Sequence, residues 1–528
     1  MRPYIAITVI LCAAVAHAQQ GGMSAHEKYQ FSKYCFEQNQ IDLGIDYIQQ
    51  AAHEGLDSAQ YDLGLIYETY QVADSAYQYI HQASKTHDDA LMRLAHYYQI
   101  GFGCQANPDK AFEITQQLAN KNHGEALYTM ASYYYQGEYV PQSKEQGSLY
   151  WHRAADSGYL DAQIGLAQYY YVGGDEWGIK KDKSKARHYA SLASKQEDPR
   201  GKTLMGNFCE KEGEMDEAIK WWKIASDEGD PSAQYNYGRF LLTGENGVSP
   251  DAQQAIALIQ AAADNNVVDA IQLLGSLYFE GIGVTKDINK GLKLLEQAAN
   301  NNNVTAQRLL GEYYLQGREV PQDIELGVYW LEKAVNGGNG EAANTLGLLY
   351  TKSDVQKAFE YFQKGHDLGN IISTYNLGHA YAYGKGVEQN DAKAFELLKL
   401  AADNDFFGGQ AFLASIYARG IGRKADYAQA VKWAQKTINN ESAKQYQGYE
   451  SNFYDCYYIL DYCYRYGLGV TRNVKKANQY KVQADKLKKF ASGEIDWEKV
   501  LTTFDEQKNQ EIIDEYNQQL GTSSDSSQ

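Results

Sequence analysis

A nine-residue pattern of small, apolar and polar positions recurs along most of this chain. It begins with a small residue, carries a large apolar residue at position 5 and Gly or Ala at position 6, and usually ends with Tyr at position 9. Clear copies are AQYDLGLIY (59–67), ALYTMASYY (126–134), AIQLLGSLY (270–278), AQRLLGEYY (306–314) and AANTLGLLY (342–350), with variants that start at residues 90, 162, 201, 233, 373, 409 and 456. A repeat about every 36 residues predicts one solenoid array rather than several globular domains.

Each unit is predicted to contain two helices. Positions 1, 5 and 9 form the apolar stripe of a first helix, and a second helix follows, as in KAFEITQQLA (110–119) and KAFELLKLAA (393–402). Glycine inside a helix costs about 1 kcal/mol relative to Ala, so Gly at position 6 predicts close approach of the second helix. Glycine turns are predicted between the helices at GFGC (101–104), GIGV (281–284), GKGV (384–387) and GLGV (467–470). The shorter units that start at Ala59 and Ala342 lack this turn and need a tighter connection.

Together, these motifs resemble Sel1-like repeats, which are close relatives of tetratricopeptide repeats. The resemblance implies an all-α, right-handed α-solenoid of about twelve or thirteen helix-turn-helix units. We expect a cap with a degenerate first repeat over 19–58 and the repeat solenoid over 59–489, with an inserted loop at 440–455. Capping helices are predicted over 490–520 and a disordered tail over 521–528.

The N-terminus has the pattern of a secretory signal. An apolar run from Ile5 to Val15 is followed by Ala16-His17-Ala18, which is an Ala-x-Ala cleavage pattern after a segment too short to span a bilayer. We therefore expect a signal peptide over 1–18 and a periplasmic or secreted protein. No later stretch reaches 18 apolar residues, so we expect no stable membrane insertion after cleavage.

Charge and cysteine usage narrow the range of partners. The formal net charge is −18, which repels phosphate backbones and makes a nucleic-acid partner unexpected. The cysteines beyond the signal segment are Cys35, Cys104, Cys209, Cys456 and Cys463, an odd number that leaves at least one free thiol. None forms a CxxC motif or a paired Cys/His spacing, so we predict neither a metal site nor a cofactor.

Catalytic signatures are missing from the sequence. It contains no G-x-S-x-G, S-x-x-K, H-E-x-x-H or phosphate-cradling G-x-x-x-x-G-K motif, and its GxG turns follow helices rather than strands. Some cysteine-rich Sel1-like proteins have been proposed to bind or hydrolyse β-lactams, and these carry a Cys pair between successive repeats. Here only Cys456 has such a place, and its expected partner position is Gly448. We therefore predict no catalytic residue and no enzyme activity.

Positions 3, 7 and 10 of the first helix should form a surface opposite the apolar stripe, because successive residues turn by about 100°. In right-handed solenoids of helix pairs this side lines the concave surface. Large aromatic side chains there are costly unless they contact something, and Tyr and Arg dominate binding hot spots. The alternative is that these aromatic residues fill gaps between repeats, as we expect for the tyrosines at position 9. The predicted partner-binding residues are Tyr61, His96, Tyr128, Tyr135, Gln168, Tyr171, Tyr235, Arg239, Phe279, Arg308, Tyr375 and His379.

The sequence thus favours a non-catalytic adaptor that binds a protein or peptide on this aromatic face. The family resemblance implies roles in envelope assembly, in host interaction or as an immunity protein against a secreted toxin. Two alternatives belong to other classes: an envelope hydrolase that acts on cell-wall material or β-lactams, and a lumenal eukaryotic quality-control adaptor.

Overall fold

A computed structural model describes residues 22–244, 249–421, 424–441, 443 and 449–488 of the chain. The described residues form 26 α-helices and one short 3₁₀ helix, and contain no β-strand. An isolated antiparallel bridge joins Gly174 and Ile179. The chain divides into two compact units, residues 1–265 and 266–528, called here the N-terminal and the C-terminal unit. The expectation of an all-α solenoid is confirmed.

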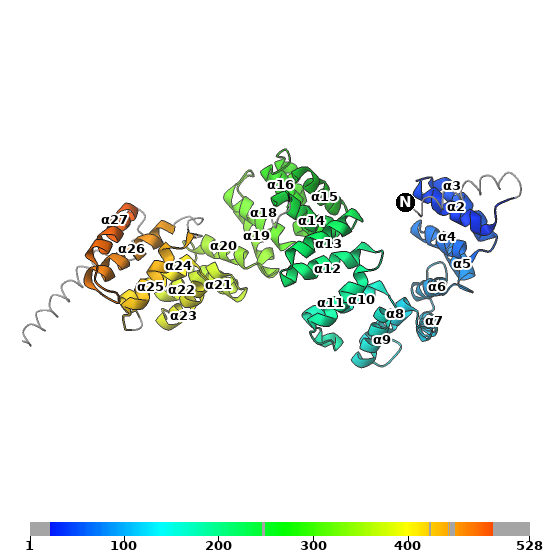
Figure 1. The fold of residues 1–528 in the computed structure, drawn as a ribbon, viewed down its shortest axis with the longest axis horizontal. Helices are drawn as coiled ribbons and strands as arrows, with labels where there is room; N and C mark the ends of the chain where they lie inside the picture. The colour runs from blue at the N-terminus through cyan, green and yellow to red at the C-terminus, as the bar shows by residue number, and fades with distance from the viewer. Residues whose placement is uncertain (1–21, 245–248, 422–423, 442, 444–448, 489–528) are drawn as a thin grey trace, which may run out of the picture. The chain divides into compact units, whose positions relative to one another are not determined.

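Even-numbered helices are the first helices of the repeats, and odd-numbered helices are the second helices (Figure 1). The N-terminal unit contains α2 (Ala25–Glu37), α3 (Ile41–His53), α4 (Asp57–Thr69), α5 (Ala73–Ala83), α6 (Asp88–Ile100), α7 (Pro108–Asn120), α8 (Gly124–Gln136), α9 (Lys144–Asp156), α10 (Leu160–Val172), η1 (Asp175–Trp177), α11 (Lys183–Ser194), α12 (Pro199–Glu212), α13 (Met215–Asp227), α14 (Pro231–Thr243) and α15 (Ala252–Asp264). The C-terminal unit contains α16 (Val268–Glu280), α17 (Ile288–Asn300), α18 (Val304–Gln316), α19 (Ile324–Asn336), α20 (Gly340–Tyr350), α21 (Val355–Asp367), α22 (Ile371–Tyr383), α23 (Asp391–Asp403), α24 (Phe407–Arg419), α25 (Tyr427–Ile438), α26 (Tyr449–Tyr466) and α27 (Val474–Leu487).

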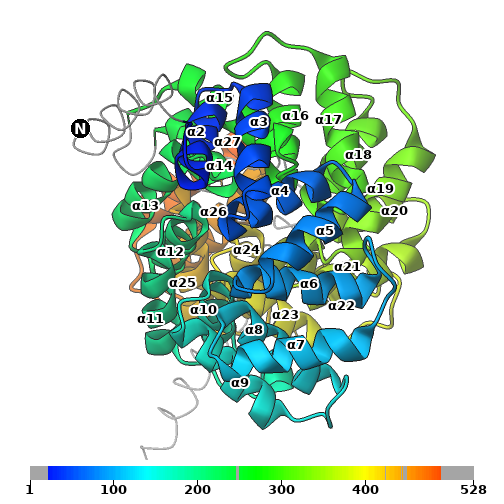
Figure 2. The same cartoon turned by 90° about the vertical axis from the view of Figure 1, so that its right-hand side faces the viewer.

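The predicted apolar stripe forms the core of each unit. Within a unit, each helix packs on the helices that precede and follow it, as α8 packs on α7 and α9 (Figures 1 and 2). Ala126 and Met130, which occupy positions 1 and 5 of the repeat pattern in α8, are fully buried. The equivalent residues of α18, Ala306 and Leu310, are also fully buried. The stripe therefore has the orientation that the sequence predicted.

The glycines at position 6 are sites of close helix contact. A Cβ built on Gly311 would lie 2.5 Å from Cγ of Leu331, which comes from the second helix of the same repeat. A Cβ on Gly275 would lie 3.0 Å from the backbone nitrogen of Leu295. The predicted close approach of the second helix is thus confirmed.

The GxG turns use their two glycines in different ways. Gly101 ends α6 in the left-handed conformation, with a φ of 75°, which is a common helix C-cap. Gly103 has a φ of 64°, and a Cβ there would overlap the carbonyl oxygen of Ala73 at the start of α5. The second glycine therefore lets the turn pack on the second helix of the preceding repeat. The two shorter repeats, which start at Ala59 and Ala342, have the predicted tighter connection between their helices. It is three residues long between α4 and α5 and four residues long between α20 and α21.

The ends of the array follow the sequence only in part. Helices α2 and α3 form the degenerate first repeat, in which the ring of Phe36 packs on Gly44. The expected loop at 440–455 is wrong for residues 449–455, which begin α26, because Phe453 and Tyr454 are buried in the core. The predicted signal peptide (1–18), capping helices (490–520) and tail (521–528) lie outside the described residues. Among the helices that are described, none is long and apolar enough to cross a bilayer.

Candidate partner-binding site

Two residues of the predicted partner-binding set belong to the core. Only 8% of Tyr135 and 1% of Phe279 is exposed, so the prediction that these side chains line an open surface is wrong. Phe279 stacks on Tyr313, with ring centroids 4.1 Å apart and planes at 6°. The hydroxyl of Tyr135 donates a hydrogen bond of 3.1 Å to the carbonyl oxygen of Trp177.

Glycines in the second helix explain this burial. A Cβ on Gly147 would lie 2.8 Å from Cδ1 of Tyr135, and a Cβ on Gly291 would lie 2.7 Å from the backbone nitrogen of Phe279. The repeat that starts at Ala306 has the same arrangement, with Gly327 against the side chain of Leu315 at position 10. In the other nine repeats from residue 59 onward, a buried Ala in the second helix occupies the position of these three glycines. Tyr135 and Phe279 therefore enter the core where the second helix offers a glycine, and Leu315 is partly buried in the same way.

The remaining predicted residues are half-buried or exposed, but they do not form one continuous strip. Tyr61 stacks on His87, His96 pairs with Glu125, Tyr171 packs on Phe208, Tyr235 lies beside Arg239, and Arg308 pairs with Glu312 and Glu341. Tyr128, Tyr135 and Gln168 line one cavity in the N-terminal unit, whereas Tyr375 and His379 line another in the C-terminal unit.

The cavity in the N-terminal unit has a volume of about 500 Å³ and lies across the first helices of four consecutive repeats. We call it the α8–α14 cavity. Its lining residues are Tyr128, Ala131, Ser132, Tyr135, Trp151, Asp161, Ile164, Gly165, Gln168, Tyr169, Trp177, Arg200, Thr203, Leu204, Asn207, Asp230 and Ser232.

Aromatic rings form one side of the α8–α14 cavity. Trp151 lies at the centre of this cluster, with its ring centroid 6.0 Å from that of Tyr128, 5.4 Å from Tyr169 and 6.0 Å from Trp177. Gly165 makes room for Trp151, because a Cβ there would lie 2.6 Å from the indole ring. The rings pack mostly edge to face, which is a favoured arrangement and holds them in place.

Trp177 reaches the cavity from an unusually long turn. The repeat that starts at Ala162 is 39 residues long, and its additional residues form η1 between α10 and α11. The bridge between Gly174 and Ile179 closes this turn, and η1 packs back on α9. The indole nitrogen of Trp177 is buried and has no hydrogen-bond partner among the described residues.

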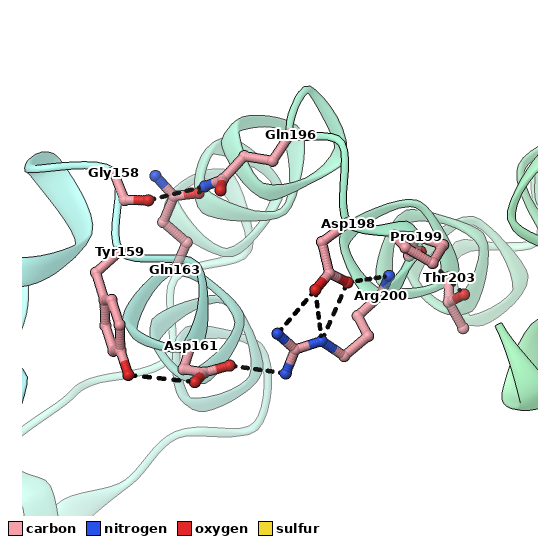
Figure 3. Close-up of polar contacts among 9 residues, drawn as sticks. All are labelled: Gly158, Tyr159, Asp161, Gln163, Gln196, Asp198, Pro199, Arg200 and Thr203. Carbon is pink, nitrogen blue, oxygen red and sulfur yellow. Dashed lines mark hydrogen bonds and ion pairs between the residues drawn. The ribbon is translucent and has the colours of Figure 1, made fainter. Parts of the chain in front are cut away.

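Charged side chains form the other side of the cavity. Arg200, near the start of α12, donates hydrogen bonds to both oxygens of Asp198 and to Oδ1 of Asp161, the last at 2.8 Å (Figure 3). Asp230, which is the N-cap of α14, accepts hydrogen bonds at Oδ1 from Thr203 and from the backbone of Ala233. Only 7% of Asp230 is exposed, and its Oδ2 has no partner in the part of the chain that the structure describes.

The electrostatic surroundings set the protonation of these groups. Hydrogen bonds from Arg200 hold the pKa of Asp198 below its usual range, so this carboxylate stays ionised. Burial, and then the charge of Asp161, raise the pKa of Tyr128, while burial raises the pKa of Tyr135 to about 12. The phenols are therefore neutral at physiological pH and can donate hydrogen bonds.

Several polar groups in the cavity are available to a ligand. Among the described residues, the hydroxyls of Tyr128 and Tyr169 and the side-chain amide of Gln168 have no hydrogen-bond partner. Asn207 uses its oxygen to accept from Trp222 and Asn236, which leaves its NH₂ group available. Aromatic faces with scattered donors and acceptors suit the binding of an amphipathic ligand.

The reactive side-chain groups of this cavity are the hydroxyls of its Tyr, Ser and Thr residues, the carboxylates of Asp161 and Asp230, and the guanidinium of Arg200. Its lining residues include no Cys, His or Lys. Across the described ranges, no group of three or more His, Cys, Asp or Glu side chains could hold a metal ion. The described cysteines are free thiols; Cys104 is half-buried and the other four are buried.

The second cavity, in the C-terminal unit, has a volume of about 390 Å³ and is more apolar. Tyr375 and His379 come from α22, and Leu348, Val355 and Phe359 come from α20 and α21. The sequence prediction thus placed residues in both cavities but missed most of the α8–α14 lining. Trp151, Trp177, Arg200 and Asp230 lie outside positions 3, 7 and 10, and the long turn was the only sequence signal for Trp177.

Comparisons with known proteins agree with this architecture. The Sel1 repeat family matches residues 57–85, 88–123, 124–159, 160–198, 204–230, 231–267, 268–303, 304–339, 343–370, 371–406, 408–442 and 455–480. A protective antigen of uropathogenic Escherichia coli that displays an SLR fold is 23% identical, with a TM-score of 0.53, over 85% of this chain and 95% of that chain. A Sel1 repeat protein from Oxalobacter formigenes is 31% identical over 45% of this chain and 98% of that chain, with a TM-score of 0.42.

A curated relative is chitin synthase regulatory factor 3 of Schizosaccharomyces pombe, which is 25% identical over 134 residues. That match spans 25% of this chain and only 14% of the yeast protein. The repeat matches, in contrast, run through most of the helices described above. On these matches and on the helix-pair architecture, the chain belongs to the Sel1 repeat family.

Proposed function

We propose that this protein is a non-catalytic scaffold that holds a protein or peptide partner at the α8–α14 cavity. Sel1 repeat proteins are generally scaffolds for protein–protein interaction. The observation that carries the proposal is the α8–α14 cavity itself, in which aromatic faces and unpartnered polar groups from consecutive repeats meet. Such a surface matches the aromatic-rich centres of protein interfaces.

The shape of the cavity fits an extended segment of a partner. Its lining comes from α8, α10, α12 and α14, the first helices of four consecutive repeats, together with Trp151 of α9 and Trp177 of η1. An extended peptide rises about 3.3 Å per residue, so a short segment can contact side chains from several of these repeats at once. Free donors and acceptors along this path can bind the main chain of the peptide, while the rings take its side chains.

We further propose that the protein is exported and works in the periplasm or outside the cell. The pattern of residues 1–18 supports this location. Roles in envelope assembly, in host interaction or as an immunity protein are all compatible with a binding groove in an exported scaffold. A hydrolase is the weaker candidate, because the cavity offers no Cys or His nucleophile–base pair among its lining residues.

The test compares a cavity variant with a surface control. The cavity variant combines Tyr128→Ala, Gln168→Ala and Tyr169→Ala, which change half-buried or exposed side chains and spare the buried Tyr135. The control is Tyr329→Ala, on α19, where 48% of the side chain is exposed. Partners crosslinked to the mature protein in the envelope fraction of its source organism are identified by mass spectrometry and then produced recombinantly.

Calorimetric titration of each recombinant partner gives the decisive result. We expect the cavity variant to weaken binding at least tenfold, because it removes two rings and an amide from the contact surface. Tyr329→Ala should bind as the wild type does, and circular dichroism should show equal helix content for all three proteins. Unchanged partner affinity in a folded cavity variant would contradict the proposal.

A further inference from the structure

We infer that the α8–α14 cavity takes a cationic side chain, Arg or Lys, from its partner. This inference rests on the function proposed above and specifies the chemistry of the segment that binds. Three features of the cavity carry it: an excess of carboxylates, a carboxylate oxygen without a partner, and aromatic rings without a cation.

Carboxylates outnumber cations on the polar side of the cavity. Arg200 is the one cation among the lining residues, and it is held between Asp161 and Asp198 (Figure 3). Its charge is therefore shared by two carboxylates, and Asp230 adds a third. An incoming cation meets net negative charge here, whereas an acidic side chain is repelled.

Asp230 supplies a specific acceptor. Its Oδ1 accepts from Thr203 at 2.9 Å and from the backbone of Ala233 at 2.7 Å, which fixes the carboxylate as the N-cap of α14. Oδ2 has no partner among the described residues, and Asp230 lines the cavity although only 7% of the residue is exposed. A hydrogen bond from a charged donor to this carboxylate would be about twice as strong as one between neutral groups.

The aromatic side of the cavity lacks the cations that cover tyrosines elsewhere in the chain. Lys290 lies over the ring of Tyr278 at 3.8 Å, and Lys110 lies over Tyr98 at 4.2 Å. Within the described residues, no Lys or Arg lies over Tyr128, Tyr169 or Trp177. These rings can therefore accept a cation from another molecule, and an arginine side chain can lie on them while its guanidinium reaches a carboxylate.

The experiment uses the mature chain, residues 19–528, and four mixtures of nonapeptides immobilised through a C-terminal biotin. Each mixture has a fixed central residue, Arg, Lys, Gln or Glu, and randomised flanking positions, with an acetylated N-terminus. Binding is measured by biolayer interferometry at low and physiological salt. We expect the Arg and Lys mixtures to bind at least tenfold more tightly than the Gln mixture, with the Glu mixture weakest and the preference smaller at higher salt.

Asp230→Asn isolates the charge. The amide keeps an oxygen that can cap α14, so the helix remains capped while the negative charge is lost. We expect this variant to reduce the preference for Arg over Gln to less than threefold. The matched control is Asp251→Asn, which changes the N-cap of α15 outside the cavity lining, and its preference for Arg should be unchanged.

The outcomes separate this inference from the proposed function. Equal binding of all four mixtures that is still weakened by Tyr128→Ala would overturn the inference and leave the peptide-binding function intact. If no mixture binds, or if chitohexaose or maltohexaose binds where the peptides do not, both proposals fail. Loss of the Arg preference in Asp230→Asn but not in Asp251→Asn supports the inference.

Discussion

The contact between Tyr135 and Gly147 gives the sharpest test of the packing, because one substitution should have opposite effects in two backgrounds. In the wild type, a methyl group on Gly147 would lie 2.8 Å from two atoms of the Tyr135 ring. That ring cannot easily move, since it is 8% exposed, its hydroxyl binds the carbonyl of Trp177, and its centroid is 4.6 Å from that of Trp177. Gly147→Ala therefore overpacks the wild-type core.

The sizes of two opposing effects determine whether Gly147→Ala stabilises or destabilises the protein. Ala in place of Gly inside a helix is favourable by up to about 1 kcal/mol. Overpacking of a rigid core costs about 1–3 kcal/mol, so Gly147→Ala alone should destabilise the protein by up to about 2 kcal/mol. Tyr135→Ala should itself cost about 3–5 kcal/mol, as for a buried Phe. In that background the ring is gone, so Gly147→Ala should stabilise by about 1 kcal/mol.

Urea denaturation followed by tryptophan fluorescence measures the four proteins of this double-mutant cycle, because Trp151 and Trp177 both contact Tyr135. Hydrogen exchange over α8 to α10 localises the effect, since repeat arrays do not always unfold in one step. A stabilising Gly147→Ala in both backgrounds would refute the proposed coupling. Equal destabilisation in both would show that the methyl group clashes with something other than the ring.

Three further predictions follow from other parts of the chain. Gly311→Leu should cost at least 1–3 kcal/mol and concentrate its effect in α18 and α19, because the new side chain meets Leu331; an unchanged urea midpoint would contradict this. Intact-mass measurement of protein recovered from its natural source should show cleavage after Ala18, and a full-length cytoplasmic protein would contradict export. Because the pKa of Asp198 is lower in the folded protein than in the unfolded chain, its ion pair should stabilise the fold fully above about pH 4. This stabilisation should be lost as the pH falls through the pKa of Asp198 in the folded protein. Arg200→Met should therefore reduce the loss of stability in acid, as measured by denaturation curves from about pH 6 to pH 2.5.

The helix pairs could be predicted from the sequence because the same pattern of small, apolar and polar residues recurs in every repeat. Gly at position 6 predicted the contact between first and second helices, and Gly311 against Leu331 confirms it. The loop expected over 440–455 failed at its C-terminal end, where aromatic residues such as Phe453 extend α26 into the core. A single repeat pattern cannot show such an extension, because it has no counterpart in the other units.

The candidate site was predicted less well, for a physical reason. The angle of a residue on one helix does not show whether the facing helix leaves room for it, and Tyr135 enters the core because Gly147 leaves that room. The pairing of a large position 10 with glycine in the second helix was present in the sequence, but only a comparison between the two helices shows it. Trp177 and Asp230 come from a turn and a helix cap, so helical periodicity gave no information about them.

The α8–α14 cavity depends on the order of repeats rather than on the content of any one of them. Trp177 extends from the turn after α10 to Tyr135 of the preceding repeat, and Arg200 of the following repeat binds Asp161. Deleting or exchanging one of these repeats would preserve the helical stacking, since every repeat offers its neighbours similar surfaces, but it would separate these partners. Duplication and loss of repeats, by which such arrays change length, would therefore erase this site while leaving a well-folded protein. Related chains with the same site should be recognised by four consecutive repeats in this order, whatever the total number of repeats.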